Sequence, residues 1–197
     1  HKLNKSYIGT IKLGERTNTL DIDGDVIEKQ EVPKITKKTL TKILTQFEGY
    51  IMQTPPSFSA IRKNNVRLYE LARKDIYIHV KPKEVQIEKI TLISFDRDIL
   101  KIEVTCSTGT YIRSLARDIG VKLKTCAFLK SLKRTRIGDF DSTNCIYLKS
   151  ISNDILGMSL VTPQTSAEGK LVRQVLIAED VYYPGESETS EFYMSVL

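Results

Sequence analysis

Residues 99–120, ILKIEVTCSTGTYIRSLARDIG, join two apolar patterns of different period, and this junction decides the fold. In the first half apolar and polar side chains alternate, which predicts a strand with one buried face. That face holds Leu100, Ile102, Val104 and Cys106. After Gly109 the apolar residues recur with helical spacing, which predicts an amphipathic helix. Its stripe consists of Ile112, Leu115, Ala116, Ile119 and Leu123.

The preceding residues carry the same two patterns. Strands are predicted over 5–14, 26–31, 76–80 and 83–96, with loops over 15–25 and 53–65. A shift of apolar parity near Glu88 and Lys89 indicates a β-bulge. One helix is predicted to begin after Thr36 as its N-cap and to end before Gly49 at the C′ position, and a second covers 66–74. Because strands outnumber helices and several are adjacent in sequence, we predict an α+β fold with a mixed or antiparallel sheet.

Domain organisation follows from where the patterns weaken. Residues 1–150 carry regular elements and are predicted to form one domain. Residues 151–197 are predicted to be a short C-terminal extension, and a single strand candidate lies within 169–183.

Composition narrows the class of protein. The 197 residues carry a net charge of +6, with three cysteines and two histidines. The cysteines are widely spaced and form no CxxC, which favours free thiols in the cytoplasm over disulfides or zinc ligands. No apolar run approaches the roughly 20 residues that span a bilayer, and no signal-peptide pattern is present. We therefore expect a cytoplasmic protein without a metal or a membrane partner.

Basic residues concentrate in one segment. Residues 122–136, KLKTCAFLKSLKRTR, are rich in lysine and arginine and contain no acid. Such a run is either a solvated face or a groove for a polyanion, and the interleaved apolar residues favour a nucleic-acid partner.

Tyr111 and Arg113 stand at the start of the predicted helix, on either side of Ile112. Because Ile112 begins the buried stripe, these two side chains cannot both enter the core. A helix N-terminus favours anions, and an arginine there can hold and orient a carboxylate. The alternative is structural, with Arg113 in a salt bridge to a nearby aspartate and Tyr111 packed on the rim.

Four separated motifs give this arrangement a family context. They are KSYIGTIKLGERTNTLDIDGDVIE, PPSFSAIRKNNVRLYELAR, CSTGTYIRSLARDIG and LKRTRIG, in this order. Together they closely resemble the bacterial tRNA pseudouridine-55 synthase family, known as TruB, over residues 1 to about 150. The resemblance implies a pseudouridine synthase-type, largely antiparallel sheet flanked by helices. It also implies isomerisation of the T-loop uridine 55 of tRNA without cofactor or metal.

The resemblance also implies roles for individual residues. Tyr7 matches the tyrosine that stacks on the flipped base, and Arg113 matches the arginine that pairs with the catalytic aspartate. Tyr111, Leu132 and, less directly, Asp21 match residues of the uridine pocket. The basic residues expected to contact RNA are Arg62, Lys63, Arg67, Lys130, Lys133 and Arg134. The expected partner is the T stem-loop of tRNA, bound by a monomer.

One family motif is missing. The loop GxxGxLDPxAxG, which carries the catalytic aspartate, does not occur among these residues. No acid precedes Arg113 within six residues, so we expect its anion to be that aspartate, supplied from upstream of His1. We likewise expect 151–197 to be too short for a complete PUA domain. The alternative is a non-catalytic tRNA-binding module or RNA chaperone; a guide-RNA-dependent synthase is a second, less economical enzyme hypothesis.

Overall fold

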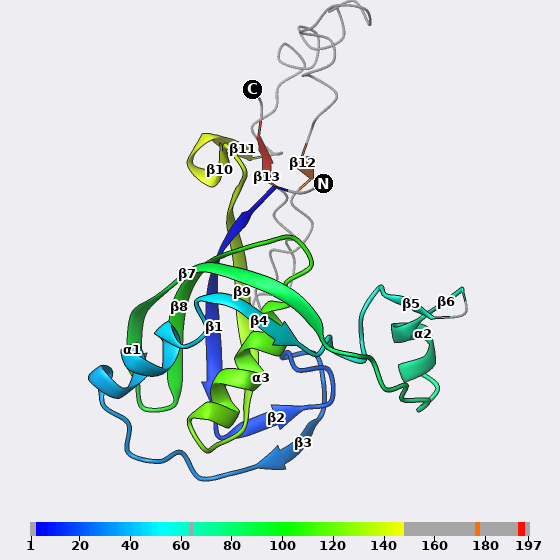
Figure 1. Ribbon diagram of the computed structural model, residues 1–197, viewed down its shortest axis with the longest axis horizontal. Helices are drawn as coiled ribbons and strands as arrows, with labels where there is room; N and C mark the ends of the chain where they lie inside the picture. Colours follow the sequence, from blue (N-terminus) through cyan, green and yellow to red (C-terminus); the bar gives the residue numbers. More distant parts are fainter. Residues whose placement is uncertain (1–2, 64, 148–175, 178–192, 196–197) are drawn as a thin grey trace, which may run out of the picture.

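A six-stranded antiparallel sheet organises the chain (Figure 1). The computed structural model describes residues 3–63, 65–147, 176–177 and 193–195. The strand order is β10-β9-β1-β8-β7-β4. The bounds are β1 Lys5–Leu13, β4 Gly49–Gln53, β7 Lys83–Asp96, β8 Ile99–Cys106, β9 Ala127–Ile137 and β10 Phe140–Asp141. The predicted α+β class with a largely antiparallel sheet is confirmed.

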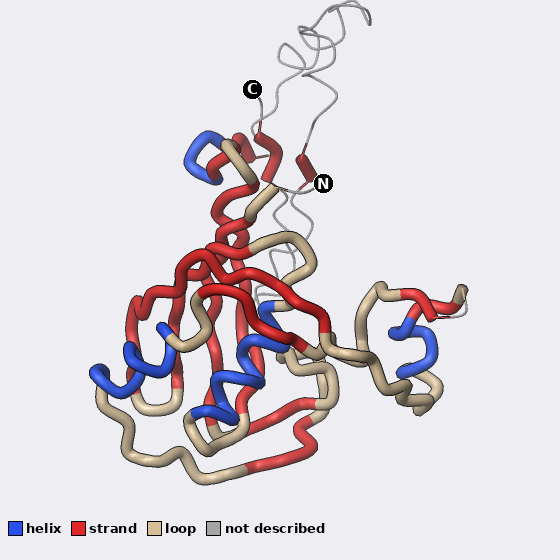
Figure 2. Tube along the Cα trace, in the orientation of Figure 1, coloured by secondary structure: helices blue, strands red, loops and turns tan. Residues whose placement is uncertain are grey.

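The two longer helices cover one face of this sheet. The helix α1 (Lys37–Thr45) lies over β7, and α3 (Ile112–Lys122) lies over β9 and β1 (Figure 2). The helix α1 begins as predicted, because the Thr36 hydroxyl accepts a hydrogen bond from the Thr39 N–H at 3.2 Å. The opposite face of the sheet carries mainly polar side chains and forms the open face.

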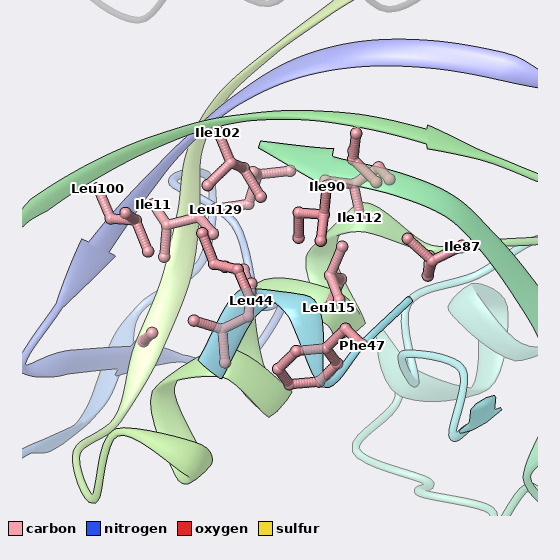
Figure 3. Packing of buried hydrophobic residues seen from close by; sticks show 14 of the residues in the cluster. Ile11, Leu44, Phe47, Ile87, Ile90, Leu100, Ile102, Ile112, Leu115 and Leu129 are labelled. Carbon is pink, nitrogen blue, oxygen red and sulfur yellow. The ribbon is translucent and has the colours of Figure 1, made fainter. Parts of the chain in front are cut away.

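The core lies between the helices and the sheet (Figure 3). The β8 residues Leu100, Ile102 and Val104 are fully buried, as their alternation predicted. On β1 the same rule buries Ile11 and Leu13 and turns Ser6, Ile8, Thr10 and Lys12 to the other face. The α3 stripe of Ile112, Leu115, Ala116, Ile119 and Leu123 completes this core. The strand and helix periods of the opening stretch therefore meet in one hydrophobic cluster.

Two local predictions about strands fit the observed register. The pairing of β7 with β8 shifts between Ile87 and Lys89, which confirms the bulge predicted at Glu88 and Lys89. The predicted strand over 26–31 is present as β3 (Val26–Lys29).

Other local predictions are wrong. Residues Glu15–Thr17, expected in a loop, form β2 and pair with β3. Residues 76–80, expected as a strand, are irregular, and Ile76 and Tyr77 are about half exposed. Gly49 does not end α1 but opens β4, at a φ of +92° that glycine adopts readily. In the segment 76–80 alternation was a poor guide, because no neighbouring strand pairs with it.

The segment between β4 and β7 stands apart from the sheet (Figure 1). It contains β5 (Arg62–Lys63), β6 (Val66–Arg67) and the short helix α2 (Leu68–Ala72). The helix predicted over 66–74 is therefore present but shorter.

The chain beyond β10 is described only in part. After the 3₁₀ turn Ser142–Asn144, the strands β11 (Cys145–Tyr147), β12 (Leu176–Ile177) and β13 (Tyr193–Ser195) form a second sheet of order β11-β13-β12. Most of the predicted C-terminal extension, 151–197, lies outside the described residues.

Candidate active site

Arg113 lies in the first turn of α3, where its guanidinium contacts two distant loops. Its Nη1 donates to Asp21 Oδ2 at 2.7 Å and to the Thr19 carbonyl at 3.1 Å. Its Nη2 donates to the Phe58 carbonyl at 2.8 Å. This chain therefore supplies an anion for Arg113, since Asp21 lies 92 residues away in sequence but adjacent in space. Pairing of Arg113 with an aspartate from upstream of His1 stays a prediction. The salt-bridge alternative is confirmed for Arg113.

Asp21 is itself held in one orientation. Its Oδ1 accepts from the Thr19 hydroxyl and from the Asp23 N–H, the latter at 3.2 Å. These local bonds form an Asx-type turn, which fixes the carboxylate relative to its own backbone. A backbone bridge between Asp21 and Leu129 ties the loop to β9. Both ends of the ion pair are therefore set by the fold, one by a helix and the other by a strand-anchored turn.

The ion pair borders a cavity of about 300 Å³. The other walls come from the Asp21 loop and from β9, and the lining residues are Asp21, Ile22, Asp23, Arg113, Leu129, Lys130, Ser131 and Leu132. Three predicted site residues from separate parts of the sequence, Asp21, Arg113 and Leu132, thus meet here. The predicted RNA contact Lys130 lies at the same cavity. The site combines a fixed cation, a fixed anion and an apolar wall.

Two predicted site tyrosines do not line this cavity. Tyr7 is 8% exposed and belongs to the core cluster, two residues before Gly9 on the same face of β1. The Arg134 guanidinium carbon lies 5.6 Å from the centre of the Tyr7 ring, within range of a cation–π contact. Tyr111 is half-buried and is the N-cap residue of α3, without a side-chain capping bond.

The basic segment 122–136 does not form a single surface. On β9, Arg134 lies opposite Tyr7 and faces the site side of the sheet, whereas Lys133 lies opposite Ile8 on the open face. The basic residues of this strand are therefore divided between its two faces, because neighbouring side chains on a strand point to opposite faces. Contact of Lys130, Lys133 and Arg134 with RNA stays a prediction.

The remaining predicted RNA contacts lie together on the segment beyond β4. Arg62, Lys63 and Arg67 are exposed on the β5–β6 hairpin. Arg67 donates to the Tyr69 hydroxyl at 3.0 Å, and this bond raises the pKa of Arg67. Arg67 and Arg73 both approach the Tyr69 ring, at 5.8 Å and 5.4 Å. This segment presents exposed cations beside an aromatic ring, away from the cavity.

Sequence reasoning missed three contributors to the site. The carbonyls of Thr19 and Phe58 hold Arg113, and a backbone acceptor leaves no signature in a sequence. Gly9 leaves a space beside Leu129, Ile112 and Leu132, which an added Cβ would fill at ordinary van der Waals distances of 3.4–3.8 Å. Its place in the alternating pattern was the available signal.

The described residues carry neither a membrane helix nor a metal cluster. No helix among them is long and apolar enough to cross a bilayer. Likewise, within 3–147 and the short strands beyond, no three His, Cys, Asp or Glu side chains gather as a group of metal ligands.

Comparison with known proteins shows which family the chain resembles. A model of the TruB family pseudouridylate synthase N-terminal domain matches residues 1–112, and one of the tRNA pseudouridylate synthase B C-terminal domain matches 113–177. Among solved structures, a chain of a Cbf5–Nop10–Gar1 complex is similar, with a TM-score of 0.49 and 22% identity over 70% of this chain and 31% of that chain.

Curated relatives named tRNA pseudouridine synthase B are more similar in sequence. The protein of Francisella philomiragia is 39% identical over 96% of this chain and 61% of its own length. That of Endomicrobium trichonymphae is 41% identical over 75% of this chain and 64% of its own length. The chain thus spans less than two thirds of these relatives. Since the first family model alone covers more than half of the sequence, this chain belongs to the TruB family of pseudouridylate synthases.

Proposed function

We propose that the protein is part of a tRNA pseudouridine synthase that isomerises uridine 55 in the T loop. The carrying observation is the Arg113–Asp21 ion pair on the wall of a cavity whose apolar side includes Leu132. Family membership supplies the reaction. In that reaction the bond between C1′ and N1 of the uridine breaks and a bond between C1′ and C5 forms. The C5 hydrogen leaves as a proton and N1 takes up a proton, so the product is an isomer of the substrate.

The substrate has to leave its stack to reach such a cavity. Extruding a nucleotide costs a few kcal/mol, and stacking on an aromatic side chain offsets about 1–3 kcal/mol of this. Tyr7 is the proposed stacking partner and Leu132 the apolar contact of the base, with Tyr111 at the rim. Because Tyr7 is 8% exposed in the free protein, stacking requires its ring to become accessible when RNA binds.

Arg113 can serve both Asp21 and a nucleophile. A guanidinium has five N–H donors, and the bonds to Thr19, Asp21 and Phe58 use three of them. Its Nε–H and one Nη2–H carry no hydrogen bond to a described residue. We propose that they hold the catalytic aspartate of the GxLDPxAxG motif, which the 197 residues do not contain. Asp21 then orients Arg113, and Arg113 orients the nucleophile.

Asp21 is a poor candidate for the nucleophile itself. Its two oxygens accept from Arg113, Thr19 and Asp23, so attack would require breaking bonds that currently fix the turn.

Two basic surfaces are proposed to grip the T stem-loop. Lys130 lies at the cavity, and Arg62, Lys63 and Arg67 project on the separate β5–β6 segment. Backbone contacts from both would position the RNA, while the cavity selects the uridine. We expect the protein to act as a cytoplasmic monomer.

The test is binding of a T-arm stem-loop to the 197-residue chain, with a stem-loop of the same length and a scrambled loop as the matched control. The proposal predicts tighter binding of the T arm, and a loss of that preference in Leu132→Lys, which places a charge on the apolar wall. Equal affinity for both RNAs would contradict it. Preference for the T arm without turnover, even when the motif-bearing segment is joined to the chain, would favour the tRNA-binding module.

A further inference from the structure

The N-terminus of α3 lacks an ordinary cap. Tyr111 occupies the N-cap position, where serine, threonine, aspartate or asparagine is preferred, and its side chain makes no capping bond. Tyr111 and Arg113 are nevertheless held in place. The question is which part of the chain fixes this end of the helix.

Gln53, the last residue of β4, binds the N-cap residue of α3. Its side chain is 1% exposed. Its Oε1 accepts from the Tyr111 N–H at 2.8 Å, and its Nε2 donates to the Tyr111 carbonyl at 3.1 Å. The amide orientation follows from the partners, because a backbone N–H has to meet the oxygen and a carbonyl the nitrogen. One side chain thus binds both backbone groups of Tyr111, as a neighbouring strand would.

The sheet brings these two residues together. Both β4 and β8 pair antiparallel with β7, so they run in the same direction on either side of it. Gly49 and Cys106 are both level with Ile87, and β4 continues from Gly49 to Gln53 after β8 has ended. The end of β4 therefore lies beside the turn that leads into α3 (Figure 1).

The residues after Gln53 continue the contact along α3. The Thr54 carbonyl accepts from the Ser114 hydroxyl at 2.8 Å and from Arg117 Nη2 at 3.1 Å. The Phe58 carbonyl accepts from Arg113 Nη2. Among the described residues of this segment, Gln53 alone bonds to the backbone of the N-cap residue, whose carbonyl also accepts the helical bond from the Leu115 N–H. That backbone sets the direction of the first helical turn.

We propose that Gln53 is a positioning residue, which binds both backbone groups of the N-cap residue and so fixes the α3 turn from which Arg113 reaches the site. Because the N-cap residue is held through its backbone from another strand, position 111 can carry a phenol that makes no capping bond. The inference deepens the proposed function and rests on it for the role of Arg113. Gln53 touches neither the cavity nor Asp21 in this structure.

The proposal predicts that loss of the Gln53 amide weakens the Arg113–Asp21 interaction without touching either residue. Gln53→Met keeps the length of the side chain and removes both bonds. A double-mutant cycle of Asp21→Asn and Arg113→Met measures the coupling, in the original chain and again in the Gln53→Met variant. We expect about tenfold coupling in the unfolding equilibrium constant of the original chain, and less than about threefold in the Gln53→Met variant, within the range usual for contacting residues.

The matched control is Gln86→Met on the adjacent strand β7. Gln86 lies opposite Tyr50 of β4, and its side chain makes no hydrogen bond among the described residues. It should leave the coupling at about tenfold. Unchanged coupling in Gln53→Met would overturn the proposal, since a side chain that only fills space would give that result.

A second measurement covers the case in which Gln53→Met does not fold. In the unmodified chain, the side-chain amide protons of Gln53 should exchange with solvent at least about tenfold more slowly than those of Gln86. Equal exchange rates would overturn the proposal. Neither experiment uses RNA, so both distinguish a failure of Gln53 from a failure of the proposed function. A chain with the predicted coupling but no T-arm preference would leave Gln53 as a positioning residue of a different site.

Discussion

Replacing Asp21 by asparagine removes the charge that faces Arg113 and keeps nearly the same side-chain shape. Two unit charges 4 Å apart attract by about 4 kcal/mol at an effective dielectric constant of roughly 20. The two side chains are 25% and 23% exposed, so solvent screens part of this attraction, and burying the charges costs part of the remainder. A hydrogen bond to a charged group contributes about 1.5–3 kcal/mol net.

Asparagine has a single acceptor oxygen, which can face either Arg113 or the local turn, and it places an NH2 donor toward the other. We therefore expect Asp21→Asn to lower the free energy of unfolding by about 1.5–3 kcal/mol. Urea denaturation measures this directly, and urea is preferred because guanidinium chloride would screen the pair. The difference between the two proteins should shrink in 1 M salt. Asp23→Asn is the matched control, because Asp23 borders the same cavity but is exposed and makes no salt bridge among the described residues. Equal losses in the two variants would refute the assignment of Asp21 as the structural partner of Arg113.

Three further predictions address RNA contacts, the base and a buried thiol. Lys130→Ala should weaken T-arm binding and reduce its salt dependence by about one unit of log–log slope. Lys133→Ala, on the open face, should leave the affinity and its salt dependence nearly unchanged. Equal effects of the two substitutions would contradict the placement of Lys130 at the cavity and of Lys133 on the open face. In a protein that carries the nucleophile, Tyr7→Phe should retain turnover, whereas Tyr7→Ala should lose far more turnover than RNA affinity. Single-turnover kinetics and binding assays measure the two quantities. Inactivity of the phenylalanine variant would show that the phenol oxygen takes part in the chemistry. Burial raises the pKa of Cys106 from 9.0 to about 11, so its contribution to stability is complete below pH 9 and is lost as the pH rises from 9 through 11. Cys106→Ala should flatten this part of the stability curve, by about 2–3 kcal/mol at its upper end, and an unchanged slope in urea titrations would contradict the assignment.

The elements of the core could be predicted from the sequence because their signals are local. The alternation in β8, the stripe of α3 and the Thr36 cap each depend on residues within one element, and burial follows directly from them. Residues 76–80 show the limit of this reasoning. Their alternation is typical of a strand, but a strand also needs a partner for its backbone, and the sequence does not say whether one is present.

The residues of the candidate site could be predicted from the sequence, but the contacts between them could not. Motifs pointed to Asp21, Arg113 and Leu132 separately. The ion pair between Asp21 and Arg113 spans 92 residues, and the bond from Gln53 to Tyr111 spans 58. Such contacts depend on strand order and register, which no local pattern determines. The same reason applies to the basic residues of β9, since a run that is continuous in sequence is divided between two opposite faces once it forms a strand.

The most direct test of the proposed function is release of tritium from a tRNA transcript labelled at C5 of uridine. Forming the bond between C1′ and C5 expels that hydrogen, so release reports the isomerisation itself. The account predicts no release by the 197-residue chain, and release when an N-terminal segment with the GxLDPxAxG motif is joined to it, restricted to uridine 55. The same extended protein with Arg113→Lys should fold and lose most of this activity, because lysine lacks the planar grip that orients a carboxylate. Release by the 197-residue chain alone would contradict the account, because the nucleophile would then be one of its own acids, with Asp21 the first to examine.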